Sequence, residues 1–69
     1  MKESKEIVKL LKNERKYIMK CLRSRIKAAR EDLKGGGIEI AINDLLGALH
    51  WQAEIDFIDY ILRRIEEAD

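Results

Sequence analysis

The chain has 69 residues, 14 of them basic and 13 acidic, so its net charge is +1 and it forms at most one domain. A single cysteine and a single histidine exclude an internal disulfide and a structural zinc site, which requires four nitrogen or sulfur ligands. Because a chain this short buries only a marginal core, association with another chain is the expected means of stabilisation.

The charges are divided unevenly along the chain. Residues 1–37 hold 12 basic and five acidic side chains (net +7), whereas residues 38–69 hold two basic and eight acidic ones (net −6). Such asymmetry indicates either a basic surface for an acidic partner or two elements that attract each other. No apolar run approaches the roughly 20 residues that span a bilayer, and the N-terminus lacks a signal-peptide core. We therefore expect a cytoplasmic protein that does not enter a membrane.

A first helix is predicted over residues 4–34. Ser4 is a good N-cap residue with Glu6 in the first turn, and the glycines at 35–37 end the helix because glycine adopts the left-handed conformation without a Cβ clash. One row of residues recurs every three or four positions, which places it on one face, and only Arg15 interrupts its apolar character. The row consists of Val8, Leu11, Arg15, Ile18, Leu22, Ile26, Ala29 and Leu33.

A second helix is predicted over residues 38–66. Its last turn holds Glu66, Glu67 and Asp69, the wrong charge for a helix C-terminus, so fraying is expected there. A row with spacings that alternate between three and four is typical of a coiled-coil seam. This row consists of Ala41, Asp44, Ala48, Trp51, Ile55, Ile58, Leu62 and Ile65.

The two rows pair when the chain is folded back on itself at the glycines. In an antiparallel hairpin, facing residues have numbers with a constant sum, and here Val8 with Ile65 and Leu22 with Trp51 both sum to 73. Half of 73 lies inside the glycine turn. The sequence therefore predicts an all-α hairpin, with small residues facing one another near the turn, where the helices can approach closely.

The second helix carries another apolar set, roughly opposite its seam. A helix that is apolar on two opposite faces is buried on both, and only a second copy of the chain is available to cover the outer one. A dimeric four-helix bundle is the simplest closed solution, and a larger ring is the alternative. The apolar set comprises Ile38, Ile42, Leu45, Leu46, Leu49, Ala53, Phe57 and Tyr60. Residues that flank the first seam can join the same core: Ile7, Leu10, Tyr17, Cys21 and Ala28.

Asp56 lies on this outer face, with Gln52 and Asp59 at its edge. It can form a polar pocket at the centre of the oligomer, or an ion pair with Arg63 or Arg15 that fixes the register of the helices. The ion pair is the favoured interpretation, because polar groups of this kind commonly specify orientation in helical bundles.

A basic stripe follows the first helix, one position after the seam row. It comprises Lys2, Lys5, Lys9, Lys12, Lys16, Lys20, Arg23, Lys27, Arg30 and Lys34. The stripe can bind nucleic-acid phosphates, chiefly through Lys16, Lys20, Arg23, Lys27 and Arg30. It can instead pair with the acidic edge of the second helix and with solvent, which the small net charge and the lack of interleaved aromatic residues favour.

Other candidate sites have simple structural interpretations. The glycines at 35–37 lack the Gly-Lys-Ser/Thr of a phosphate loop. His50 and Glu54, four residues apart, are typical of a surface pair rather than an acid–base site. Trp51 is expected in the core, and Gly47 indicates either close helix approach or room for a ligand. We therefore expect no enzymatic activity, no metal and no cofactor.

The chain resembles, in its size, its lysine- and isoleucine-rich helices and its simple hairpin, the short helical-hairpin accessory proteins that phages and mobile elements encode. This resemblance implies a regulatory protein that binds a host protein, sequesters a small nucleotide-like anion or regulates transcription. A small anion would bind between protomers, where bundles usually place their sites. The candidate ligand residues are Arg15, Arg25, Arg63 and Arg64 for charge, with Trp51, Tyr60 or Tyr17 for stacking.

Overall fold

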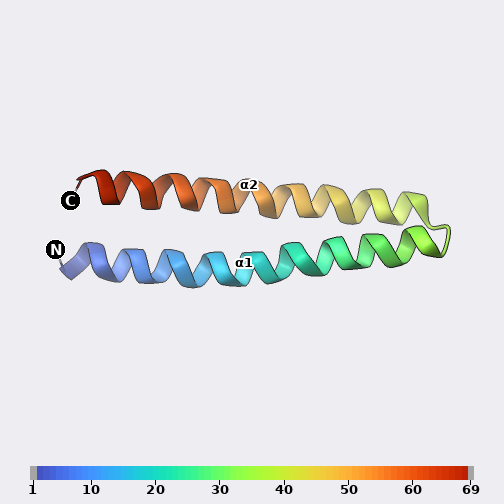
Figure 1. The fold of residues 1–69 in the computed structure, drawn as a ribbon, viewed down its shortest axis with the longest axis horizontal. Coiled ribbons are helices and arrows are strands. Elements are labelled where there is room, and N and C mark those ends of the chain that lie inside the picture. Colours follow the sequence, from blue (N-terminus) through green and yellow to red (C-terminus); the bar gives the residue numbers. More distant parts are fainter. Residues whose placement is uncertain (1, 69) are drawn as a thin grey trace.

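The computed structural model describes residues 2–68, without the side chains of residues 2 and 3, as two long antiparallel helices (Figure 1). Helix α1 spans Lys2–Lys34 and helix α2 spans Ile38–Ala68. The helices lie side by side along their whole length, with the turn at one end of a rod that measures 52 × 15 × 11 Å. The predicted all-α hairpin is confirmed.

Both helices extend beyond the predicted bounds. Ser4 lies inside α1 and does not cap it, and α2 continues through Glu66 and Glu67 to Ala68, whereas Asp69 lies outside the described residues. Adding a residue to an existing helix costs little once the first turns have formed. Val8 and Ile65 are half-buried near the open end, so both seam rows stay partly buried in the terminal turns.

The glycine turn forms a Schellman motif at the end of α1. Gly36 has a φ of 84°, its N–H donates to the carbonyl of Leu33 at 3.2 Å, and the N–H of Gly37 donates to the carbonyl of Asp32 at 2.7 Å. The carbonyl of Gly37 then accepts the first bond of α2, from the N–H of Ala41 at 3.0 Å. Only Gly36 requires glycine for its backbone conformation.

Replacing Gly36 with alanine should lower the free energy of unfolding by about 1 kcal/mol, the cost of a left-handed conformation with a Cβ atom. No atom lies within 4 Å of the Cβ position, so backbone strain is the whole effect. Gly35→Ala is the matched control, because its φ is not positive and the added Cβ would meet only carbonyl oxygens at ordinary contact distance. Urea unfolding followed by circular dichroism checks both variants, and equal losses would contradict the assignment.

Every buried hydrophobic residue of the described chain belongs to one of the two predicted rows. The core cluster joins Ile18 and Leu22 of α1 to Ile55 and Ile58 of α2. Toward the turn the buried residues are small, namely Ala29, Ala41 and Ala48, as predicted from the sequence. Burial of these rows holds the helices together, since apolar area removed from water is the main favourable term in folding.

Leu33 is the one member of the rows that the structure leaves largely exposed, at 52%. The neighbouring Asp32 is half-buried instead. The seam of α1 therefore shifts by one residue in its final turn, where Asp32 faces Asp44 of α2.

Candidate interaction surfaces

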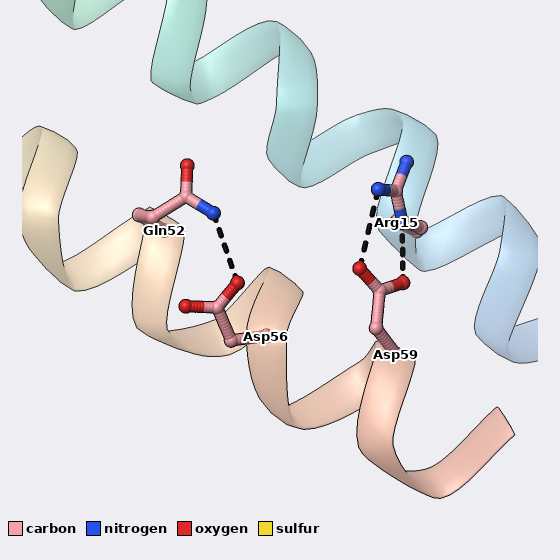
Figure 2. Close-up of polar contacts among 4 residues, drawn as sticks. All are labelled: Arg15, Gln52, Asp56 and Asp59. Atoms are coloured by element: carbon pink, nitrogen blue, oxygen red, sulfur yellow. Dashed lines mark hydrogen bonds and ion pairs between the residues drawn. The ribbon is translucent and has the colours of Figure 1, made fainter. Parts of the chain in front are cut away.

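An ion pair between Arg15 and Asp59 crosses the seam (Figure 2). The Nε and Nη2 atoms of Arg15 donate to the two carboxylate oxygens of Asp59 at 2.7 and 3.3 Å, a bidentate arrangement. These hydrogen bonds lower the pKa of Asp59, and partial burial opposes them. The only polar member of the α1 row thus has a partner on the other helix.

Within the hairpin, Asp56 forms no ion pair with Arg15 or Arg63. Its carboxylate is exposed and accepts a hydrogen bond from Nε2 of Gln52, one turn earlier in the same helix, at 3.0 Å (Figure 2). Asp59, which was expected only at the edge of the outer face, follows the seam residue Ile58 and therefore points closer to α1. Asp59, not Asp56, is the partner of Arg15.

A second polar group crosses the seam near the turn. Asp44 is the only buried charged residue in the described chain, at 9% exposure, and accepts a hydrogen bond from Nη1 of Arg25 at 3.2 Å. Arg25 reaches Asp44 by passing over Gly47, where an added Cβ would lie 3.3 Å from Nε of Arg25. Gly47 thus makes room for a side chain of α1, an interpretation that sequence analysis had not offered.

Asp32 completes this group. Its pKa is raised above the ordinary value, chiefly because its protonated carboxyl can donate a hydrogen bond to Asp44, and further because of burial and the negative charges of Asp44 and Glu31. Two carboxyl groups and one guanidinium therefore meet at the turn end of the seam. Periodicity marked Asp44 as a member of its row but gave no sign of this group.

Asp32 and Asp59 should give opposite pH dependences of stability. Because the pKa of Asp32 is raised in the folded chain, its protonated carboxyl stabilises the fold. This contribution is complete below pH 3.8 and is lost as the pH rises through the raised pKa. Because the pKa of Asp59 is lowered in the folded chain, its ionised carboxylate stabilises the fold above pH 3.8. This contribution is lost as the pH falls through the lowered pKa.

We expect the native chain to become more stable as the pH falls from neutral toward 3.8, because Asp32 becomes protonated. The Asp32→Asn variant should lack this increase in the free energy of unfolding. Asp59→Asn is the opposite case. The native chain should lose stability below pH 3.8 as Asp59 becomes protonated, and the variant should lack this decrease. Urea unfolding midpoints measured across this range test both variants. An Asp32→Asn variant that follows the pH profile of the native chain would contradict the assignment.

The residues predicted to bind a small anion are not gathered in one hairpin. Arg15 and Arg25 already bind Asp59 and Asp44, and the guanidinium of Arg64 lies 6.0 Å from the centre of the Tyr60 ring. Tyr60 is nine residues beyond Trp51, or about 13 Å along a helix that rises 1.5 Å per residue. Arg63 is exposed near Arg64.

One part of that set does come together in the structure. Arg25 and Trp51 line the same open groove between the helices, with Lys20, Cys21 and Ser24. Trp51 also packs against the core cluster, as expected, and Cys21 is a half-buried free thiol. The guanidinium of Arg25 donates a hydrogen bond to Asp44. Its charge is therefore largely neutralised and is of little use for binding an anion in this groove.

His50 and Glu54 form a local pair on the polar side of α2. Nε2 of His50 lies 3.3 Å from the Glu54 carboxylate, and the His50 ring meets the Trp51 ring edge-on with centroids 5.4 Å apart. Both residues line an open groove with Glu14 and Phe57. Within residues 4–68, no three histidine, cysteine or acidic side chains gather where they could hold a metal ion.

The outer face of α2 is exposed in the isolated hairpin. Its large apolar residues are between 44% and 65% exposed, and Ile40, which the sequence analysis had not included, is also exposed. The exposed large apolar residues of α2 are Ile38, Ile40, Ile42, Leu45, Leu46, Leu49, Phe57 and Tyr60. Six of these eight lie between residues 38 and 49, so the apolar surface is densest near the turn.

The two sides of the hairpin carry different apolar residues. One open groove contains Ile26 of α1 with Leu45 and Leu49 of α2, and these leucines each follow a seam residue by one position. Another groove contains Glu14 with Phe57, and these two each precede a seam residue. Positions before and after a seam residue lie on opposite sides of a helix, about 100° away in each direction.

The apolar flank of α1 therefore lies on the opposite side of the hairpin from Ile42, Leu45 and Leu49. Leu10 and Tyr17, like the rest of the flank, precede a seam residue by one position. The sequence suggested that this flank can join the same core as the outer face of α2. A single flat interface cannot bury both.

The basic stripe stays in solvent. All nine of its side chains that the structure describes, from Lys5 to Lys34, are exposed. The three ion pairs found among the described residues involve none of them. The suggested pairing of the stripe with the acidic edge of α2 therefore does not occur within the described part of the hairpin.

Neither helix contains, over its described length, a segment that is apolar and long enough to cross a lipid bilayer. Comparison of the chain with protein-family models, with curated proteins and with solved structures yields no significant match.

Proposed function

We propose that the protein is a non-enzymatic binding protein that works as a homo-oligomer, most simply a dimer in which a second copy covers the outer face of α2. One observation carries this proposal. The described chain exposes 12 large apolar side chains but buries only four, namely Ile18, Leu22, Ile55 and Ile58. Exposed apolar surface on this scale is typical of an interaction site and not of a free monomer.

A second copy is the occupant that the composition favours. The hairpin has a small core of its own, and chains of this size without disulfides or metals are commonly stabilised by association. The apolar residues concentrate on one helix, so two copies related by a two-fold axis can bury the same surface on both partners. We take the partner that the oligomer binds to be a macromolecule. Two of the four arginines predicted to bind a small anion, Arg15 and Arg25, are engaged within the hairpin, and the other two are exposed near the end of α2.

Sedimentation equilibrium with a matched pair of variants tests this proposal. Leu49 and Leu10 are both 65% exposed, but they lie on opposite sides of the hairpin. Leu49→Glu should raise the dimer dissociation constant by at least about a hundredfold, because it places a charge on each of the two facing surfaces. Leu10→Glu should leave the dissociation constant within about threefold, a difference of less than 1 kcal/mol.

Two results would contradict the proposal. A native chain that sediments at 8.1 kDa at all accessible concentrations would exclude self-association. Dissociation by Leu10→Glu and not by Leu49→Glu would move the interface to the flank of α1. Circular dichroism of each variant shows whether the hairpin itself stays helical.

A further inference from the structure

The structure sorts the basic residues of α1 into two groups. Arg15 and Arg25 lie on the seam side, and each is bound by an aspartate of α2. The other described basic residues of α1 belong to the stripe, and they are exposed and outside the ion pairs of the described chain. The hairpin thus uses two arginines for its own architecture and presents the remaining positive charge outward.

The stripe forms a continuous positive surface. Successive members of the stripe lie three or four residues apart, so they are neighbours along one face of the helix. Glu14 and Asp32 fall on other faces, whereas Glu6 and Glu31 border the stripe, each three and four residues from two of its members. One stretch of the stripe, with Lys16, Lys20 and Arg23, borders an open groove that also contains Arg15 and Met19.

We propose that the basic stripe of α1 binds the phosphodiester backbone of a nucleic acid without sequence preference. A polymer of regularly spaced negative charges matches the stripe, because the cations recur every three or four residues along a rod 52 Å long. That length corresponds to about 15 base pairs at 3.4 Å each. Backbone contacts position a protein on nucleic acid but carry no base information.

The lack of sequence preference follows from the composition of the stripe. Lysine and arginine alone make up its ten positions, so it offers no aromatic ring on which a base could stack. Tyr17, the aromatic residue of α1, precedes the seam residue Ile18, whereas stripe residues follow the seam. The stripe belongs wholly to α1 and the outer face wholly to α2. Because stripe residues, Leu45 and Leu49 all follow a seam residue, the stripe lies on the same side of the hairpin as these leucines and borders the surface that a second copy would cover. The proposal rests on the exposure of the stripe in the hairpin and is tested separately from self-association.

Fluorescence anisotropy with labelled oligonucleotides of random sequence tests the proposal, with one duplex DNA and one single-stranded RNA, each about 20 nucleotides long. The logarithm of the association constant should fall linearly with the logarithm of salt concentration, by about 0.9 for each duplex phosphate neutralised and about 0.7 for each single-strand phosphate. The two probes thereby show which form of backbone the stripe prefers.

A pair of double variants with the same net charge localises the site. Lys20→Gln with Lys27→Gln removes two stripe cations, and Arg63→Gln with Arg64→Gln removes two exposed cations of α2. The stripe variant should weaken duplex binding at least about tenfold near 0.1 M salt and make the salt slope shallower by about 1.8. The α2 variant should change binding by less than about threefold. Lys20→Arg with Lys27→Arg should retain the native affinity, since it keeps both charges.

Three results would overturn the proposal. One is the absence of binding to either oligonucleotide at low salt. Another is an equal loss of affinity in both charge-removing variants, which would show a response to net charge alone. The third is binding to vesicles that contain anionic lipid without binding to either oligonucleotide, which would identify a membrane surface as the partner. Circular dichroism confirms that each variant keeps the native helix content.

Discussion

Replacing Ile55 with alanine is expected to lower the free energy of unfolding by about 2–5 kcal/mol, the range for truncating a buried isoleucine. Ile55 is 1% exposed and is the largest fully buried side chain of the described hairpin. It packs in the core cluster with Ile18, Leu22 and Ile58. Because only four large apolar residues are buried among those that the structure describes, the cavity removes much of the apolar contact between the helices, and a loss of this size can unfold the chain.

The matched control is Leu10→Ala, the truncation of an apolar side chain of the same size that is 65% exposed and lies on α1, away from the outer face of α2. It should change the free energy of unfolding by no more than about 0.5 kcal/mol. Urea unfolding followed by circular dichroism, with all variants at one protein concentration, measures both effects. Similar losses in the two variants would show that the stability of the chain comes from a surface other than the seam.

Enlarging Ala41 to leucine is the second substitution with a large expected effect, a loss of about 1–3 kcal/mol from overpacking. Ala41 is 0% exposed, and it faces α1 in the part of the hairpin where Ala29 and Ala48 are also buried. The buried side chains between the helices are small there, so little space is left for a larger one. A leucine would push α2 away from α1 and disturb the bond between Arg25 and Asp44.

Ala68→Leu is the control for this substitution, since Ala68 is exposed on α2 and lies outside its outer face. Leucine and alanine both have high helix propensity, so the variant should keep or increase stability. The unfolding midpoint in urea checks the pair. An Ala41→Leu variant as stable as the native chain would show that the seam near the turn is loosely packed.

Much of the fold was predictable from the sequence, because it rests on periodicity and on one backbone conformation. Rows with a spacing of three and four residues define the buried face of each helix, whatever lies opposite. The glycine triplet locates the turn, because Gly36 must adopt a positive φ that other residues avoid. The bounds of the helices were less predictable, because terminal turns depend on packing against the other helix as well as on capping residues, and Val8 and Ile65 are half-buried there.

The polar contacts could not be predicted in the same way. The choice of Asp59 over Asp56 as the partner of Arg15 depends on the rotation of α2 about its own axis and on its stagger against α1. A shift by a fraction of a turn would exchange these partners without changing the spacing of the apolar row. The same holds for Arg25, which reaches Asp44 only because Gly47 leaves space on the facing helix.

The sequence by itself therefore determined two amphipathic helices, their antiparallel pairing at the glycine turn, and an apolar surface on α2 that the hairpin cannot bury. Only the tertiary structure decided which charges are satisfied inside the hairpin and which remain in solvent. It placed two arginines of α1 against aspartates of α2 and left the stripe from Lys5 to Lys34 exposed. Periodicity fixes the face on which a residue lies, whereas an ion pair requires a distance between two helices, and that distance exists only once they have packed.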